Sequence, residues 1–180
     1  ALVFLDGKKV GGVFKDLFHF GGFPEPFVKK QEVAWRRFQN ERTERLIKED
    51  IRDLEKIGDL SGLQVLAEIL PQKVGSLLSL NSLSEDLQVN YRTAAHWVEV
   101  LERFYYHFRI YPFANTKIKS LRKQPKLYLG DWSSVLESGA RLENMVASHL
   151  LKAVHFLHDA YGYKAELNFL RDLEGREVDF

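Results

Sequence analysis

Five basic side chains gather between Ile110 and Leu129, and no acidic residue interrupts them: Lys117, Lys119, Arg122, Lys123 and Lys126. Lysine and arginine bind phosphate groups by charge, without reading base sequence. The spacing therefore predicts a segment that grips a nucleic-acid backbone. A solvated loop whose basic side chains bind nothing explains the same charge run, and the residues alone leave both interpretations open.

Two short helices joined by a tight turn are predicted just before this basic segment. Asn81 and Asn90 are candidate N-caps, because an asparagine side chain accepts hydrogen bonds from the free amides of a first helical turn. Apolar side chains then recur at the spacing of one buried helical stripe, at Ala94, Val98, Leu101 and Tyr105. This pattern predicts helices over 80–87 and 91–104, which is typical of a helix-turn-helix. The β-rich stretches 105–111 and 126–129 predict a wing after it.

The second predicted helix turns polar side chains away from the apolar stripe. Those that we expect to contact double-stranded DNA are Arg92, Thr93, His96 and Arg103, together with the five basic residues of the wing. Glu99 and Glu102 offset the two arginines, so the helix carries no formal net charge, whereas a helix that reads DNA is usually more basic.

Composition limits the class of protein. The chain has 180 residues, 45% hydrophobic and 28% charged, with a formal net charge of +1 and no cysteine. Disulfides and thiolate metal sites are therefore excluded. No apolar run is long enough to span a bilayer and no signal peptide is recognisable, so we expect a cytoplasmic protein that does not enter a membrane.

The remaining segments are mainly helical. We expect a strand over 1–5, a glycine- and proline-rich loop over 21–27, helices over 28–58, 63–70 and 140–157, and a hairpin over 164–170 and 176–180. No Gly-x-x-x-x-Gly-Lys-Ser/Thr sequence accompanies the glycines, so they do not form a phosphate loop. His155 and His158 have metal-ligand spacing, but an ordinary helix surface is the better interpretation of two histidines without a third ligand.

Several short motifs occur in an order that resembles the C-terminal region of a large prokaryotic family of AAA-type ATPases. They are Gly21-Gly22-Phe23-Pro24, Glu49-Asp50-Ile51, the 80–113 helix-turn-helix, 125–131, Leu142-Glu143-Asn144 and Gly175 to Phe180. In that family an ATPase core precedes a helical linker, a winged helix and a domain similar to restriction endonucleases. The resemblance covers the chain from about Phe20 onward.

The resemblance implies a fold, partners and a half-complete metal site. The fold class is α+β: a glycine-rich entry segment and helical linker (1–60), a winged helix-turn-helix (61–129) and the truncated start of an endonuclease-like α/β domain (130–180). Glu143 and Asp179 match two metal-binding carboxylates of that domain, and the strand with its lysine would follow Phe180. Glu143 as a helix-start carboxylate and Asp179 as a turn residue are the alternatives.

The chain is thus expected to be part of a longer ATPase that uses ATP and Mg²⁺, with no cofactor and no catalytic residue of its own in this stretch. DNA contact is its predicted role. The alternative roles are a protein-interaction or homo-oligomerisation module, with an exposed apolar patch at Trp97, Phe104, Tyr105 and Tyr106, or part of a metal-dependent nuclease completed by later sequence.

Overall fold

The computed structural model describes residues 7–55, 57–114, 116, 120–121, 123–172, 174 and 176–180, and these form an α+β fold that is mainly helical. The α-helices are α1 (Gly7–Phe20), α2 (Pro24–Lys29), α3 (Glu32–Arg45), α4 (Arg52–Leu54), α5 (Leu60–Ile69), α6 (Leu80–Asp86), α7 (Tyr91–Arg103) and α9 (Ser138–Tyr161). A π-helical turn, η1 (Leu46–Ile51), joins α3 to α4, and 3-10 turns lie at η2 (Leu70–Lys73) and η3 (Trp132–Ser134).

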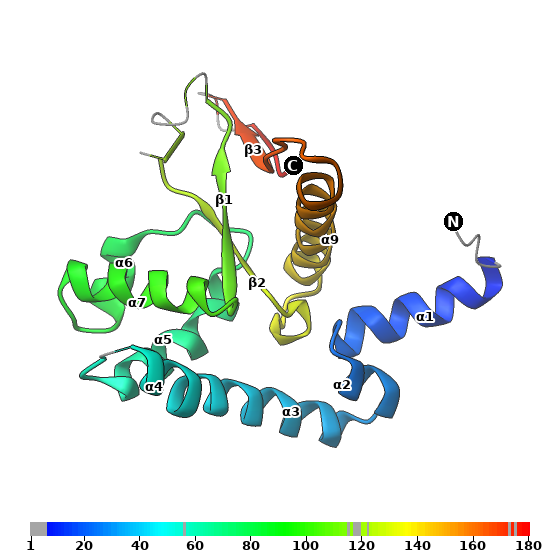
Figure 1. Cartoon of the computed structure of the whole chain (residues 1–180), viewed down its shortest axis with the longest axis horizontal. Helices are drawn as coiled ribbons and strands as arrows, with labels where there is room; N and C mark the ends of the chain where they lie inside the picture. Colours follow the sequence, from blue (N-terminus) through cyan, green and yellow to red (C-terminus); the bar gives the residue numbers. More distant parts are fainter. Residues whose placement is uncertain are drawn as a thin grey trace.

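The strands are β1 (His107–Pro112), β2 (Lys126–Leu129), β3 (Asn168–Arg171) and β4 (Glu177–Val178), in the sheet order β2-β1-β3-β4. The β1–β2 pair is antiparallel, with Ile110 opposite Lys126, and β1 pairs with β3 in parallel. Leu77 forms a single antiparallel bridge with Lys126. Figure 1 shows α5, α6 and α7 grouped below this strand pair and α9 standing beside it.

The core lies where α5, α6 and α7 meet β1 and β2, as the apolar periodicity predicts. Leu66, Leu70, Leu83 and Val98 are all buried there, and Leu87 packs against them while half-exposed. Burying each such side chain contributes about 1.5–3 kcal/mol. The three helices α5, α6 and α7 therefore share one apolar core.

Periodicity fails at two helix ends. The helix α7 ends at Arg103, and Tyr105 adopts a left-handed backbone (φ 58°) with its side chain 84% exposed, so its expected place in the stripe is wrong. In the 28–58 region the π-helical turn η1 shifts the phase of the helix. Ile47 and Ile51 are buried, whereas Leu54, which continues their spacing, is exposed.

Helix caps explain two further differences from the sequence-based expectation. Ser79, rather than Asn81, caps α6, since its hydroxyl accepts from the Ser82 amide at 3.2 Å. Residues 21–27 are not all loop, because α2 begins at Pro24, where a proline fits the first turn of a helix. The strand expected over residues 1–5 lies outside the described residues.

The turn between α1 and α2 packs against the turn that follows β2. Gly21 has a positive φ of 83°, and a β-carbon there would lie 2.5 Å from Asp131 Oδ1. Asp131 is buried and accepts hydrogen bonds from the Gln39 side-chain amide (2.7 Å) and the Ser133 amide (3.1 Å). Only glycine allows this close approach, so this joint explains the glycine pair better than a phosphate loop does.

The long helix α9 is fixed to β2 by a buried asparagine. The Asn144 side chain accepts from the Leu129 amide and donates to the Leu129 carbonyl, both at 2.8 Å. The expected hairpin follows as β3 and β4, which are antiparallel. Within the described part of the chain, no helix combines the length and apolar character that a bilayer span requires.

A buried histidine makes the fold sensitive to acid. His107 is 1% exposed, its Nε2 lies 2.9 Å from the Val98 carbonyl, and its Nδ1 has no partner among the described residues. Burial lowers the pKa of His107 from 6.5 to about 4. The stability that depends on the neutral ring is therefore present above pH 6.5 and is lost as the pH falls through 4.

We predict that His107→Gln, which retains a donor toward Val98, removes this part of the acid sensitivity. The native chain should lose about 3 kcal/mol relative to the variant between pH 6.5 and 4. Urea unfolding at several pH values measures the difference. Parallel stability curves for the two proteins over that interval would contradict the prediction.

Candidate functional site

The helices α6 and α7 are joined by a tight turn at residues 87–90, as expected. Asn90 caps α7, because its side-chain oxygen accepts from the Thr93 amide at 2.9 Å. The α7 residues Ala94, Val98 and Leu101 are buried in the core, which leaves the opposite side of the helix facing solvent. The sequence thus determines which face of α7 is available to a ligand.

The residues predicted to contact DNA lie on the outward face of α7, and they differ in whether their charges are paired within the protein. Arg92 and His96 are exposed, and neither forms an ion pair with any residue that the structure describes. Thr93 is half-buried. Arg103, at the other end of the helix, pairs with Glu55 at 2.9 Å. Within α7, only the N-terminal half therefore presents a positive charge without an ion-pair partner among the described residues, which we call uncommitted.

A groove of about 230 Å³ lies beside the N-terminus of α7. Its lining comes from α6, α7, β1 and the chain before β2, and includes Tyr91, Arg109, Tyr111, Lys123 and Gln124. Lys123 is exposed, whereas Arg109 Nε donates to Glu102 Oε2 at 2.9 Å, so the arginine charge is neutralised within the protein. The predicted contacts Lys117, Lys119 and Arg122 lie outside the described residues.

Lys126 does not belong to an exposed basic cluster, and that expectation is wrong. Its side chain is 3% exposed, and its ammonium lies 2.5 Å from Glu177, 2.6 Å from Asp179 and 3.5 Å from Glu143. Burial alone would lower the pKa of Lys126, but hydrogen bonds to Asp179 and Glu177 and the charge of Glu143 outweigh burial and raise it. Lys126 is consequently a buried internal cation.

The two carboxylates that the resemblance assigns to a metal meet at this lysine. Glu143 also accepts a hydrogen bond from the Tyr128 hydroxyl at 2.6 Å, and a β-carbon on Gly75 would lie 3.1 Å from its oxygens. Burial and the neighbouring Glu143 carboxylate raise the pKa of Tyr128. An ammonium, rather than an open position, lies between Glu143 and Asp179, which does not fit a divalent cation.

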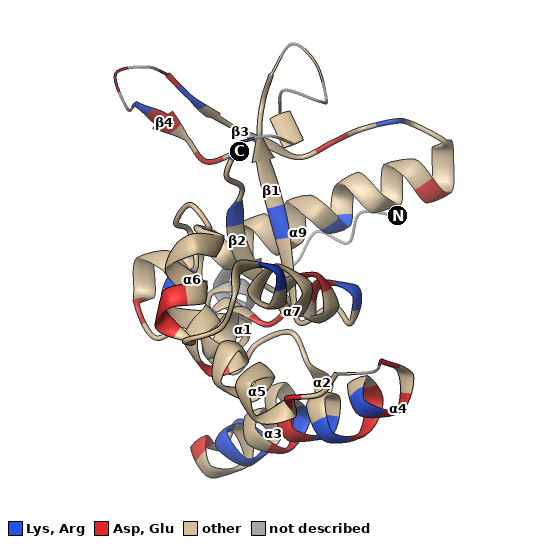
Figure 2. Cartoon of the chain, turned by 90° about the vertical axis from the view of Figure 1, so that its left-hand side faces the viewer, with Lys and Arg blue, Asp and Glu red and all other residues tan. Residues whose placement is uncertain are grey.

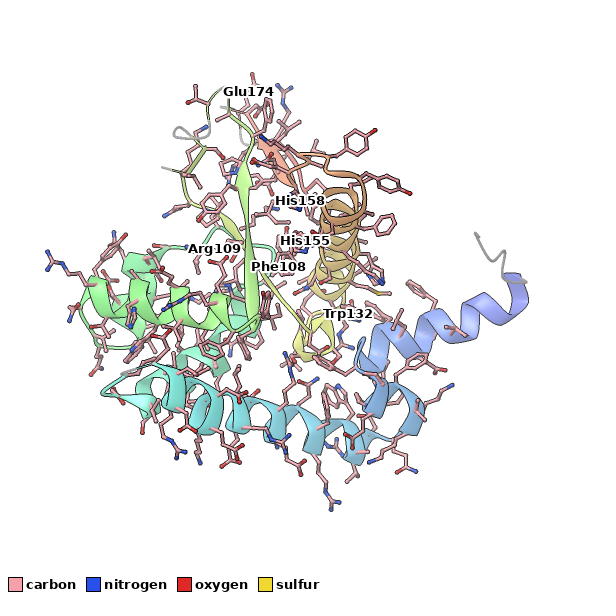
Figure 3. All side chains as sticks on the ribbon, in the orientation of Figure 1. Phe108, Arg109, Trp132, His155, His158 and Glu174 are labelled. Atoms are coloured by element: carbon pink, nitrogen blue, oxygen red, sulfur yellow. The ribbon has the colours of Figure 1, made fainter. Side chains whose placement is uncertain are left out.

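The placement of the other possible metal ligands agrees with this geometry. In the part of the chain that the structure describes, no three His, Cys, Asp or Glu side chains form a group that could hold a metal ion. His155 and His158 face β1 from α9 (Figure 3) and line a hollow of about 410 Å³ with Arg109. Both histidine side chains are exposed.

The apolar patch expected of an interaction module is not formed at the predicted residues. Trp97 is 3% and Tyr106 7% exposed, and the Tyr106 hydroxyl donates to the Ala67 carbonyl at 2.7 Å. Only Tyr105 projects fully into solvent, while Phe104 packs against the core. Exposed apolar side chains gather on α9 instead.

Charge on the rest of the surface is mixed. Figure 2 shows acidic and basic residues interspersed along α3 and α4. Several form pairs one helical turn apart, such as Lys48 with Glu44 at 2.6 Å. These pairs are exposed to solvent, which weakens them, and they leave no large field of one sign on those helices.

A comparison with protein-family models assigns the chain to a family. The model described as Domain of unknown function (DUF8612) matches residues 12–137. This span is more than half of the chain, so the chain belongs to that family. Searches of curated proteins and of solved structures found no match.

We predict that Lys126→Met destabilises the protein by about 2 kcal/mol or more, because three carboxylates lose their buried counter-charge. Lys152→Met, at an exposed position on α9, is the control and should change stability by less than about 0.5 kcal/mol. Urea unfolding at neutral pH measures both effects. Equal stability of the two variants would contradict this role for Lys126.

We also predict how the stabilities of the native chain and of Lys126→Met differ at alkaline pH. Because the pKa of Lys126 is raised above its ordinary 10.5, its contribution is complete below pH 10.5 and is lost as the pH rises through the raised value. The stability gap between the native chain and Lys126→Met should therefore narrow only above pH 10.5.

Proposed function

We propose that this chain is an accessory, DNA-contacting region that acts without catalysis of its own. The observation that carries the proposal is the exposed N-terminal half of α7, where Arg92 and His96 are uncommitted and Lys123 lies at the adjoining groove. Side chains at this end of the second helix of a helix-turn-helix reach into a major groove. Lys123 would neutralise a neighbouring phosphate.

The order of the elements supports a winged-helix interpretation. Helix α5, the bridge at Leu77, α6, α7 and the antiparallel pair β1–β2 follow one another, and a three-helix unit followed by a strand pair is the arrangement of a winged helix. The resemblance to the C-terminal region of AAA-type ATPases supports the same interpretation. In this proposal the partners are duplex DNA and an ATPase core elsewhere in the protein, to which ATP and Mg²⁺ belong.

The charges limit how the DNA is held. Arg103 and Arg109 are paired with glutamates, and Lys126 is buried, so they add little to phosphate binding. Glu99 is exposed on α7 and opposes a phosphate nearby. We therefore expect modest, strongly salt-dependent affinity that relies on backbone contacts, with little discrimination between sequences.

The proposal predicts that Arg92→Ala combined with Lys123→Ala weakens duplex binding about tenfold at low salt. It should also reduce the slope of log affinity against log salt by roughly 1–2, since each phosphate contact contributes about one unit. Fluorescence anisotropy with a labelled 20-base-pair duplex measures both quantities.

A matched control removes the same charge elsewhere. Arg36 and Lys164 are exposed and distant in sequence from α7, so Arg36→Ala with Lys164→Ala should bind as the native chain does. Absence of binding by the native chain at 20–50 mM salt, or equal loss in the two double variants, would remove the proposal.

A further inference from the structure

The groove beside the N-terminus of α7 is aromatic as well as basic. Tyr91, the first residue of α7, lines it and is 51% exposed. Tyr111 of β1 lines the same groove and is half-buried. A tyrosine ring has an apolar face and a polar tip, so an exposed ring in a polar groove can stack with a flat ligand. The groove therefore offers more to a ligand than the charge of Lys123.

Arg109 supports the second of these rings from within the protein. Its guanidinium carbon lies 5.9 Å from the centre of the Tyr111 ring. Its Nε donates to Glu102 Oε2 at 2.9 Å, which holds the guanidinium in place. The arginine therefore restrains the aromatic wall of the groove, and its charge is not available to a phosphate.

Two side-chain amides in the groove have no partner among the described residues. Asn81 of α6 and Gln124, just before β2, are both exposed and both line the groove. Asn81 is not needed as a helix cap, because Ser79 caps α6. Within the described part of the chain, neither side-chain amide forms a hydrogen bond. A carboxamide places donors beside an acceptor, which matches the donor and acceptor pattern on the edge of a nucleobase.

The size of the groove limits what it can take. Its volume of about 230 Å³ is smaller than the roughly 300–1,000 Å³ of pockets that enclose drug-sized ligands. It therefore suits one flat group whose remainder stays outside. Lys123 is exposed in the same groove without an ion-pair partner among the described residues, and its charge is complementary to a phosphate. A flat polar ring attached to a phosphate is the chemistry of a nucleotide.

We propose that this groove receives an unpaired base of the DNA that the chain contacts. Tyr91 stacks on the base, and the amides of Asn81 and Gln124 bond to its edge. Lys123 neutralises the phosphate beside it. Stacking on aromatic side chains together with backbone neutralisation is how proteins hold single-stranded DNA.

This inference rests on the proposed DNA contact and specifies the class of DNA. A base within an intact duplex is paired and stacked, and it must be extruded before an aromatic side chain can stack on it. A duplex that continues into a single strand presents unpaired bases without that cost. The preferred partner is therefore a duplex with a single-stranded overhang.

The test compares two labelled duplexes that differ only in their overhang. One overhang carries bases, and the other is built from abasic nucleotides with the same number of phosphates. Fluorescence anisotropy at low salt should show about fivefold or tighter binding of the overhang that carries bases, as expected from stacking of one base.

Substitution of Tyr91 shows whether the groove is responsible. Tyr91→Ala should remove the preference for bases, whereas Tyr91→Phe, which keeps the ring, should retain it. Tyr91→Ala should also leave the salt dependence of binding unchanged, because tyrosine neutralises no phosphate. Tyr105→Ala is the control, since Tyr105 is 84% exposed and lies outside the groove, and it should bind as the native chain does.

The outcomes separate this inference from the proposed function. Equal binding of the two overhangs by the native chain, or a preference for bases that Tyr91→Ala retains, would overturn the inference and leave the duplex contact of α7 standing. Equal loss of the preference in Tyr91→Ala and Tyr105→Ala would also overturn it. Failure of the native chain to bind any of these duplexes would remove the inference and the proposed function together.

Discussion

The burial of one lysine determines how the two halves of this structure meet. The ammonium of Lys126 leaves water almost completely, and the cost of moving a charge out of water must be offset by partners at short range. Those partners come from α9, through Glu143, and from the end of the chain, through Glu177 and Asp179. The C-terminal elements therefore supply the carboxylates that the buried charge on β2 requires.

This constraint also shapes the surface that we propose for DNA contact. The antiparallel pair β1–β2 rests on the α5–α7 core through buried side chains such as Ile110 and Leu127, while Lys126 and Asn144 attach α9 to β2. Of the five basic residues predicted to form the wing cluster, the structure describes two: Lys123, which is exposed, and Lys126, which is buried. The DNA contact that we propose therefore relies on the N-terminal half of α7 and the groove next to it.

Local patterns predicted much of the fold and little of the candidate site. The Asn90 cap and the stripe from Ala94 to Leu101 depend on neighbours within a few residues, and a sequence displays such neighbours directly. Lys126 differs, because one of its carboxylate partners, Asp179, is 53 residues away. A lysine within a basic run looks like a surface charge until the strands bring those carboxylates beside it.

Helix phase was predictable only where the helix stays regular. One π-helical turn moved Leu54 into solvent, and a left-handed residue ended the stripe before Tyr105. On α9, Leu142, Val146 and Leu150 recur at the spacing of one helix face. Whether that face meets the core or solvent depends on tertiary packing, and Glu143 and Asn144 on the adjoining face are the residues that hold α9 to β2.

The central claim is that α7 and its adjoining groove form the surface that meets duplex DNA. Amide chemical shifts of the isotope-labelled chain, followed while a short duplex is added at low salt, test it residue by residue. The account predicts that the largest changes fall at residues 91–96 and at Lys123 and Gln124, and that they disappear as salt is raised. Two results would contradict it: unchanged chemical shifts at these amides when the duplex is saturating, or shift changes concentrated on α1 to α3.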